Sequence, residues 1–459
     1  MTALGLIALG LGVAVAALVW LRLHAFLAMM LAAFVVAVAT PSSVLEGYAE
    51  HQVAIQKMDA GDVASFAGSG APDRVLKAFG DTCGSIGVLI AMASIMGRCL
   101  LDSGAAMRIV QAILALFGQA RAHLAFVFAG FTLAIPVYFD AVFYLLMPIG
   151  KAMARVTKGN YLLYVLTIVA GATMAHSLVP PTPGPLFAAE ELGVDVGTMM
   201  LGGVIVGSFS VGFGLLFAKW ANRRWTIELP EEDGPSADIE SSAHLPPLLW
   251  CVLPILVPIA LIAWGSFAET EPWWTDRNVA LAIGAGISLV LLTKHRQAGT
   301  LSVHDAVGDA VMSGAAILLI TAAGGAFGST LRQTGVADLI QQLGSSSAQT
   351  WALPICFLIT TLVRTAQGSA TVAMITAAPI AKAFLEAGEL GFHPVYLALA
   401  IGCGSKPIPW LNDSGFWIIT RMSGMKESET LKIVTPMMSL MGLTGLPVVM
   451  IGAWLWPMV

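Results

Sequence analysis

The sequence predicts an all-α protein that crosses a membrane many times, and both its composition and its apolar runs indicate this. Hydrophobic residues make up 57% of the 459 residues and charged residues only 11%, whereas soluble domains carry about a quarter charged residues. About 20 apolar residues in a helix span the roughly 30 Å of hydrocarbon in a bilayer. Apolar blocks near this length occur at 2–20, 25–40, 195–218, 247–266 and 431–458. The runs are continuous rather than alternating, so we expect helices and not the strands of a membrane barrel.

Charge and cysteine usage exclude several functional classes. The net charge of -5 arises mainly in loops and indicates no nucleic acid partner. The cysteines lie mostly inside apolar runs and match no CxxC or zinc-binding spacing, so we expect no metal site and no cofactor. The sequence contains no HExxH, GxSxG or Walker A motif, and we therefore do not expect an enzyme. The cysteines are Cys83, Cys99, Cys251, Cys356 and Cys403.

Two halves of the chain are similar to each other. A shift of 231 positions places Gly184 on Gly415 (415 − 184 = 231). The same shift places Pro148-Ile149-Gly150-Lys151-Ala152 on Pro379-Ile380-Ala381-Lys382-Ala383. Two apolar stretches can match by chance in Gly, Ala or Leu, but shared Pro and Lys are harder to explain in that way. We therefore predict an internal repeat.

The charges predict that the two halves are inverted, because Lys and Arg collect in cytoplasmic loops. The first half is rich in Lys and Arg where its counterpart has few and adds acidic residues. An odd number of crossings in each half would invert one copy relative to the other, as in many secondary transporters. We expect residues 41–78 and 267–277 outside the cell, and the polar stretch 46–80, which overlaps the first of these regions, is predicted as an external loop with one short amphipathic helix. The predicted units are a first repeat at 1–224, a cytoplasmic linker at 225–245 and a second repeat at 246–459.

Four helix breaks are predicted, in two repeat-related pairs. Unpaired backbone groups are tolerated in a membrane only where they are buried in protein or line a cavity, so the breaks mark a candidate site. Two re-entrant hairpins are expected at about 121–153 and 352–384, and two broken helices at about 161–192 and 395–423. Prolines interrupt both broken helices, as in Pro180-Pro181-Thr182-Pro183-Gly184-Pro185. The free N–H groups of helix ends attract anions, and free carbonyl groups can hold a cation.

Five stretches of the chain carry a family resemblance, namely Asp102–Ala106, Ile135–Asp140, Pro180–Pro185, Arg364–Thr371 and Asn412–Trp417. Together they resemble the gluconate permease family of the ion-transporter superfamily. The resemblance covers most of the chain beyond residue 79 and implies proton-coupled symport of gluconate or a related sugar acid. It also implies a homodimer in the bacterial inner membrane and an elevator-type movement. The chain departs from the family pattern at Thr182 and at Pro409-Trp410, so a smaller hydroxy acid stays open as the substrate. A sodium-coupled carboxylate transporter stays open as the alternative function.

Arg364 is the main candidate for binding the carboxylate of a substrate. An unpaired cation in an apolar stretch is costly, and the planar guanidinium matches a carboxylate. The alternative is a structural salt bridge to Asp140 or Asp413. Lys406 is a further candidate partner for Asp413.

Asp140, Asp413 and His176 are the candidates for carrying the coupling proton, because buried carboxyl and imidazole groups can titrate near neutral pH. The alternatives are helix capping for the two aspartates and packing for His176. Neutral side chains and backbone groups at the breaks would complete a polar substrate site, although their hydroxyl and amide groups also bond to neighbouring backbone. These residues are Tyr138, Thr182, Gly184, Gln367, Gly368, Ser369, Thr371, Ser405, Asn412 and Ser414.

Overall fold

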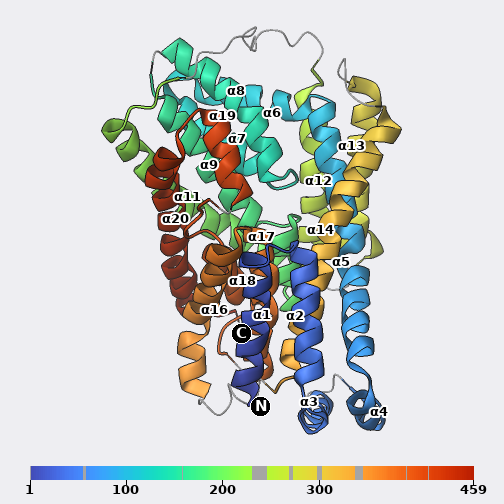
Figure 1. Ribbon diagram of the computed structural model, residues 1–459. Coiled ribbons are helices and arrows are strands. Elements are labelled where there is room, and N and C mark those ends of the chain that lie inside the picture. The colour runs from blue at the N-terminus through green and yellow to red at the C-terminus, as the bar shows by residue number, and fades with distance from the viewer. Residues whose placement is uncertain are drawn as a thin grey trace.

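The computed structural model describes most of the chain, and every regular element in the described part is a helix (Figure 1). The described residues are 2–54, 58–157, 159–229, 245–267, 272–296, 302–335, 345–388, 390–411 and 413–458. The helices before the predicted linker are α1 (Ala3–Val19), α2 (Ala25–Ala39), α3 (Ser42–Ala54), α4 (Val63–Gly68), α5 (Ala71–Asp102), α6 (Ala105–Phe117), α7 (Ala122–Leu133), α8 (Phe139–Thr157), α9 (Tyr161–Leu178), α10 (Pro183–Glu191) and α11 (Val196–Arg224). Those after it are α12 (Leu248–Phe267), α13 (Arg277–His295), α14 (Val303–Arg332), α16 (Ser345–Gln367), α17 (Ala370–Glu386), α18 (Val395–Gly404), α19 (Ser414–Ser423) and α20 (Glu427–Leu455).

Several helices have the length and composition of membrane spans. Six helical stretches among the described residues qualify, and two sharply bent pairs raise the number to eight. The outer face of α11 is apolar, since Leu201, Ile205, Phe209 and Leu216 expose between 56% and 64% of their surface. Such a stripe is unfavourable in water but suits a lipid-facing helix. The prediction of an all-α, multi-pass membrane protein is confirmed at this level.

The helices pack into two groups. One group, which we call the α14 group, contains α2, α5, α12, α13 and α14 and lies on the right in Figure 1. The other, the α9 group, contains the helices from α7 to α11 and from α16 to α20 and lies on the left. The groups meet mainly where α14 packs against α17, while α1 packs against both α2 and α16.

Two glycines of α14 make the α14–α17 contact unusually close. A Cβ atom at Gly328 would lie 2.1 Å from the Cβ of Pro379, and one at Gly324 would lie 2.0 Å from the Cγ2 of Ile375. Both distances are far below van der Waals contact, so no residue with a side chain fits without movement. Glycine therefore lets the backbones of the two helices approach, as in small-residue contacts of membrane helices.

One expected loop is largely helical. The stretch 46–80 contains α3 and α4, and α5 already begins at Ala71. Pro72 and Asp73 favour this start, because proline is tolerated in the first turn and an acid stabilises the helix N-terminus. The linker residues 230–244 lie outside the described residues, and the inverted relation of the two halves stays a prediction.

Candidate functional site

The helix ends produce four gaps in the α9 group. The α7–α8 hairpin is open between Leu133 and Phe139, and the α16–α17 hairpin between Gln367 and Ala370. The gap between α9 and α10 holds Pro180 and Pro181, and the gap between α18 and α19 holds Pro407 and Pro409. At the α16–α17 tip Gly368 has a φ of 90°, a conformation that favours glycine.

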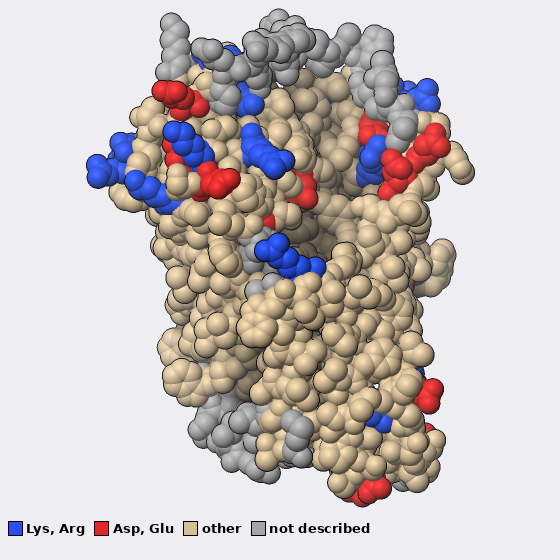
Figure 2. Space-filling model, in the orientation of Figure 1, with Lys and Arg blue, Asp and Glu red and all other residues tan. Residues whose placement is uncertain are grey.

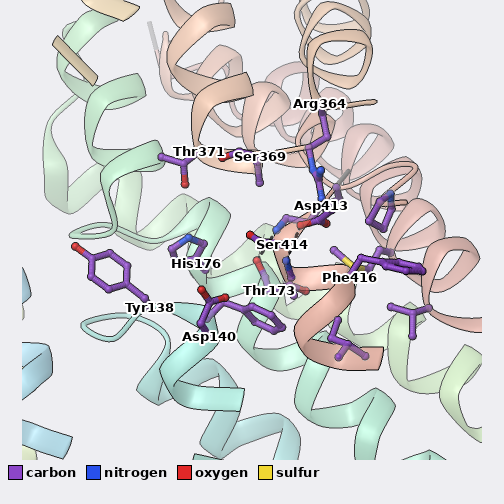
Figure 3. Close-up of a pocket in the computed structure, with 18 of the residues that line it drawn as sticks. Tyr138, Asp140, Thr173, His176, Arg364, Ser369, Thr371, Asp413, Ser414 and Phe416 are labelled. Atoms are coloured by element: carbon purple, nitrogen blue, oxygen red, sulfur yellow. Dashed lines mark hydrogen bonds and ion pairs between the residues drawn. The ribbon is translucent and has the colours of Figure 1, made fainter. Parts of the chain in front are cut away.

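A cavity of about 410 Å³ lies between these gaps (Figure 3). Side chains from both hairpin tips and from both broken helices line it, and α14 adds Ser313 and Ile317. Asp140 and Ser414 are exposed, so the cavity communicates with solvent. The polar lining residues are Tyr138, Asp140, Thr173, His176, Ser313, Arg364, Ser369, Thr371, Lys406, Asp413 and Ser414.

Three helix N-termini reach this cavity. They are the first residues of α8 at Phe139, of α17 at Ala370 and of α19 at Ser414. Ser369 caps α17 by accepting the amide of Val372 at 3.3 Å. The first N–H groups of a helix lack intrahelical partners and carry the positive end of its dipole. The arrangement therefore favours a negatively charged group in the cavity.

Arg364 is held by the protein itself. Its side chain is 2% exposed, and its Nε donates to the carbonyl of Ser405 at 3.1 Å. Its other two nitrogens donate to the carbonyl of Gly368 and to Asp413. The alternative role predicted for Arg364 is a structural salt bridge to Asp140 or Asp413, and the observed partner is Asp413. The guanidinium thus joins the hairpin tip to the break between α18 and α19.

Lys406 is a second buried cation in the cavity wall. It is 2% exposed, and its Nζ donates to the carbonyl of Thr173 at 2.6 Å. The suggested pairing with Asp413 is wrong, because the carboxylate of Asp413 bonds instead to Arg364 and to the amide of Gly415. Sequence reasoning left Lys406 out of the site, although a lysine directly at a break in an apolar stretch was a usable signal.

Asp140 and His176 face the same space (Figure 3). Within the described ranges, no cation lies within ion-pair distance of Asp140. The Nδ1 atom of His176 is buried without a hydrogen-bond partner among the described residues. Its ring meets Tyr138 edge-on at 6.3 Å, and the Tyr138 hydroxyl bonds to Ser94 of α5 at 2.9 Å. Asp413 differs from these two side chains, because both of its carboxylate oxygens accept hydrogen bonds, one from Arg364 and one from the amide of Gly415.

Comparison with known proteins identifies the family. The sequence model of the GntP permease family matches residues 58–455 of this chain. The chain belongs to the GntP permease family. A gluconate permease of Pseudomonas aeruginosa is 30% identical, and the match covers 82% of this chain and 88% of that protein. The inner membrane permease YgbN of Escherichia coli is also 30% identical, over 81% of this chain and 86% of its own length.

Members of the GntP family are permeases, so this chain is a membrane transporter and not an enzyme. A solved structure has a similar fold. The YdaH transporter of Alcanivorax borkumensis superposes with a TM-score of 0.60 at 15% sequence identity, and the match covers 87% of this chain and 90% of that chain.

Four further residues predicted for the site of this GntP permease lie around the cavity rather than in its wall. Thr182 lines a small neighbouring cavity, where its hydroxyl donates to the carbonyl of Val179 at 2.8 Å. Gly184 packs against Met374. Gly368 and Ser405 lie behind Arg364 as its acceptors. Asn412 and the side chain of Gln367 fall outside the described residues.

The same GntP permease has a second, larger cavity of about 940 Å³ between α5, α10, α14 and α17. Ion pairs between the two helix groups lie beside it. Glu190 of α10 pairs with Arg277 of α13, and Glu191 of α10 pairs with Arg332 of α14. Lys382 of α17 also approaches Glu191, at 3.4 Å. These contacts therefore link α10 to both helix groups.

Proposed function

We propose that this protein is a secondary active transporter that carries gluconate, or a related small sugar acid or hydroxy acid, together with protons across the bacterial inner membrane. The observation that carries the proposal is the cavity at the four helix gaps, where three helix N-termini and the buried Lys406 surround a solvent-connected space. The names of the related gluconate permease and inner membrane permease support the substrate class and the location.

The composition of the cavity wall supports a hydroxylated anion. Helix N-termini and an ammonium group stabilise a carboxylate. Hydroxyl groups on Ser313, Thr371 and Ser414 can donate to and accept from the hydroxyl groups of a sugar acid. Phe139 and Phe416 add apolar surface for its carbon chain. The volume of about 410 Å³ lies within the usual range for small-molecule sites.

The coupling proton is assigned to Asp140 or His176. Both line the cavity, and neither is tied into the Arg364 ion pair. Moving a charged site through a layer of low dielectric constant is costly, so a proton that balances the charge of the site lowers the barrier. Asp413 is the weaker candidate, because its two oxygens accept from Arg364 and from Gly415.

An elevator-type movement of the α9 group against the α14 group would carry the cavity across the membrane. The concentration of hairpin tips and broken helices in one group supports this assignment. The close α14–α17 contact is then a sliding surface, and the ion pairs of Glu190 and Glu191 hold one end position. The homodimer that the family resemblance implies would anchor the static part.

Uptake by the full chain in proteoliposomes tests the proposal. An inwardly directed proton gradient should drive accumulation of labelled gluconate, and a protonophore should abolish that accumulation. Asp140→Asn should retain exchange of internal for external gluconate but lose proton-driven accumulation, because exchange needs no net proton movement. Accumulation that requires sodium and ignores pH would overturn the coupling, and equilibration without accumulation would indicate a channel.

A further inference from the structure

We propose that Lys406, and not Arg364, is the residue that binds the carboxylate of the substrate, so that one ammonium group sets the preference for monocarboxylates. This inference rests on the proposed function and deepens it. Both cations are buried in the wall of the same cavity. They differ in that Arg364 is paired with a carboxylate, Asp413, and Lys406 is not paired with one among the described residues.

The charge of Arg364 is already neutralised, and each of its three nitrogens donates to the protein. The guanidinium contacts the carbonyls of Ser405 and Gly368, and its charge is neutralised by Asp413. A carboxylate ligand could bind there only by competing with Asp413, whose burial makes separation of the pair costly. Arg364 is therefore a positioning residue that fixes the α16–α17 tip against the start of α19.

The ammonium group of Lys406 has donors to spare. It carries three N–H donors, and the described structure gives it one acceptor, the carbonyl of Thr173. No carboxylate of the described residues lies within ion-pair distance of its Nζ. A buried cation without a counter-ion is unfavourable, and an anion in the cavity removes that cost. The substrate carboxylate thus provides the counter-ion that Lys406 lacks in the ligand-free protein.

The position of Lys406 suits this role. It follows the last turn of α18 and contacts α9 through Thr173, which lies one turn before His176. The start of α19, with the exposed Ser414, lines the same space. A carboxylate at Lys406 would therefore also face the N-terminus of α19. A dicarboxylate would bring a second negative charge, for which the cavity offers no second lysine or arginine among the described residues apart from the paired Arg364.

Binding to the purified full chain tests the proposal with two probes of matched shape, gluconate and glucitol, which differ in the carboxylate. The wild-type protein should prefer gluconate. Lys406→Gln should weaken gluconate binding by on the order of 100-fold, to the level of glucitol, and leave glucitol binding unchanged. Lys406→Arg should retain part of the preference. Lys219→Gln, which removes an exposed charge of α11, is the matched control and should change neither affinity.

A ligand-free measurement separates this proposal from the proposed function. Lys406→Met should leave the melting temperature unchanged or raise it, because it removes an uncompensated buried charge and because Thr173 lies inside α9, where its carbonyl already has a helical partner. When the wild-type chain binds gluconate, a preference for gluconate that survives Lys406→Gln overturns the assignment. When it binds neither probe, gluconate is excluded as substrate, and a lower melting temperature for Lys406→Met then shows that Lys406 is structural and overturns the assignment.

Discussion

At the scale of single residues, the site depends on how two buried cations divide their roles. Arg364 and Asp413 neutralise each other, and Asp413 also caps α19 through the amide of Gly415. Removing one member of a buried pair leaves the other charge without compensation, which typically costs about 3–5 kcal/mol. The pair is therefore expected to be necessary for the fold of the site, and Lys406 for its affinity.

A double-substitution series tests the role of Arg364. Arg364→Met should lower the free energy of unfolding by about 3–5 kcal/mol, because it leaves Asp413 buried and unpaired. Adding Asp413→Asn should recover much of that loss, since asparagine keeps an oxygen for the α19 cap but carries no charge. Denaturant or thermal unfolding in detergent measures both changes. A single substitution as stable as the wild type would contradict the clamp, and so would a double substitution no more stable than the single one.

The residues of the cavity were partly predictable from the sequence, because helix breaks in an apolar chain must face a cavity. The helix breaks predict a site position for Tyr138, Asp140, His176 and Ser414, and all four line the cavity. The sequence could not decide which cation pairs with Asp413. That choice depends on how the side chains of two distant segments meet in the fold, since Arg364 and Asp413 are 49 positions apart in the sequence.

At the scale of helices, the α14–α17 contact is the surface along which the two groups would slide in the proposed elevator movement. Gly324 and Gly328 have no side chains on the face of α14 that meets α17, so side chains of α17 pack directly against the backbone of α14. A small-residue face has few protruding side chains that must pass one another, and the cost of sliding is correspondingly low.

A disulfide between the helices should stop transport. In Gly324→Cys/Ile375→Cys the two Cβ atoms would lie about 3.4 Å apart, close to the spacing of a disulfide. Oxidation should abolish gluconate uptake, and a reductant should restore it, because the cross-link fixes the α9 group to the α14 group.

The matched control cross-links two helices of one group. Gly445→Cys on α20 would place its Cβ atom 3.4 Å from that of the native Cys403 on α18. Oxidation of this variant should leave uptake intact. Full uptake by the oxidised Gly324→Cys/Ile375→Cys variant, with the disulfide verified by mass spectrometry, would exclude sliding at this contact.

The helices were more predictable than the polar stretches between them. Long apolar blocks and prolines gave the approximate positions of α1, α2, α11 and α20. The sequence predicts a loop at the start of α5 because the first turns of this helix are polar. Their polar side chains find partners far away in the sequence, since Arg74 donates to Gln333 at 3.0 Å and to the carbonyl of Ala37 at 2.8 Å. Such partners cannot be read from a local pattern.

At the scale of the whole molecule, charge and chain ends define two different faces. Basic side chains gather at the upper end in Figure 2, the end where α6, α8 and α19 lie in Figure 1. Both termini lie in the lower half in Figure 1. The C-terminal segment is fixed there, since the amide of His393 donates to the carbonyl of Pro457 at 2.7 Å. Because Lys and Arg favour the cytoplasmic side, the upper end is expected to face the cytoplasm.

Reporter fusions test this orientation. Alkaline phosphatase becomes active only where its disulfides form, outside the cytoplasm. Fused after the C-terminus it should be active, because α20 runs from the basic end at Glu427 towards the opposite end at Leu455. Inserted between α11 and α12 it should be inactive, since α11 ends with Arg223 and Arg224 at the basic end. Activity at the second position and none at the first would reverse the orientation and place the basic end outside the cytoplasm.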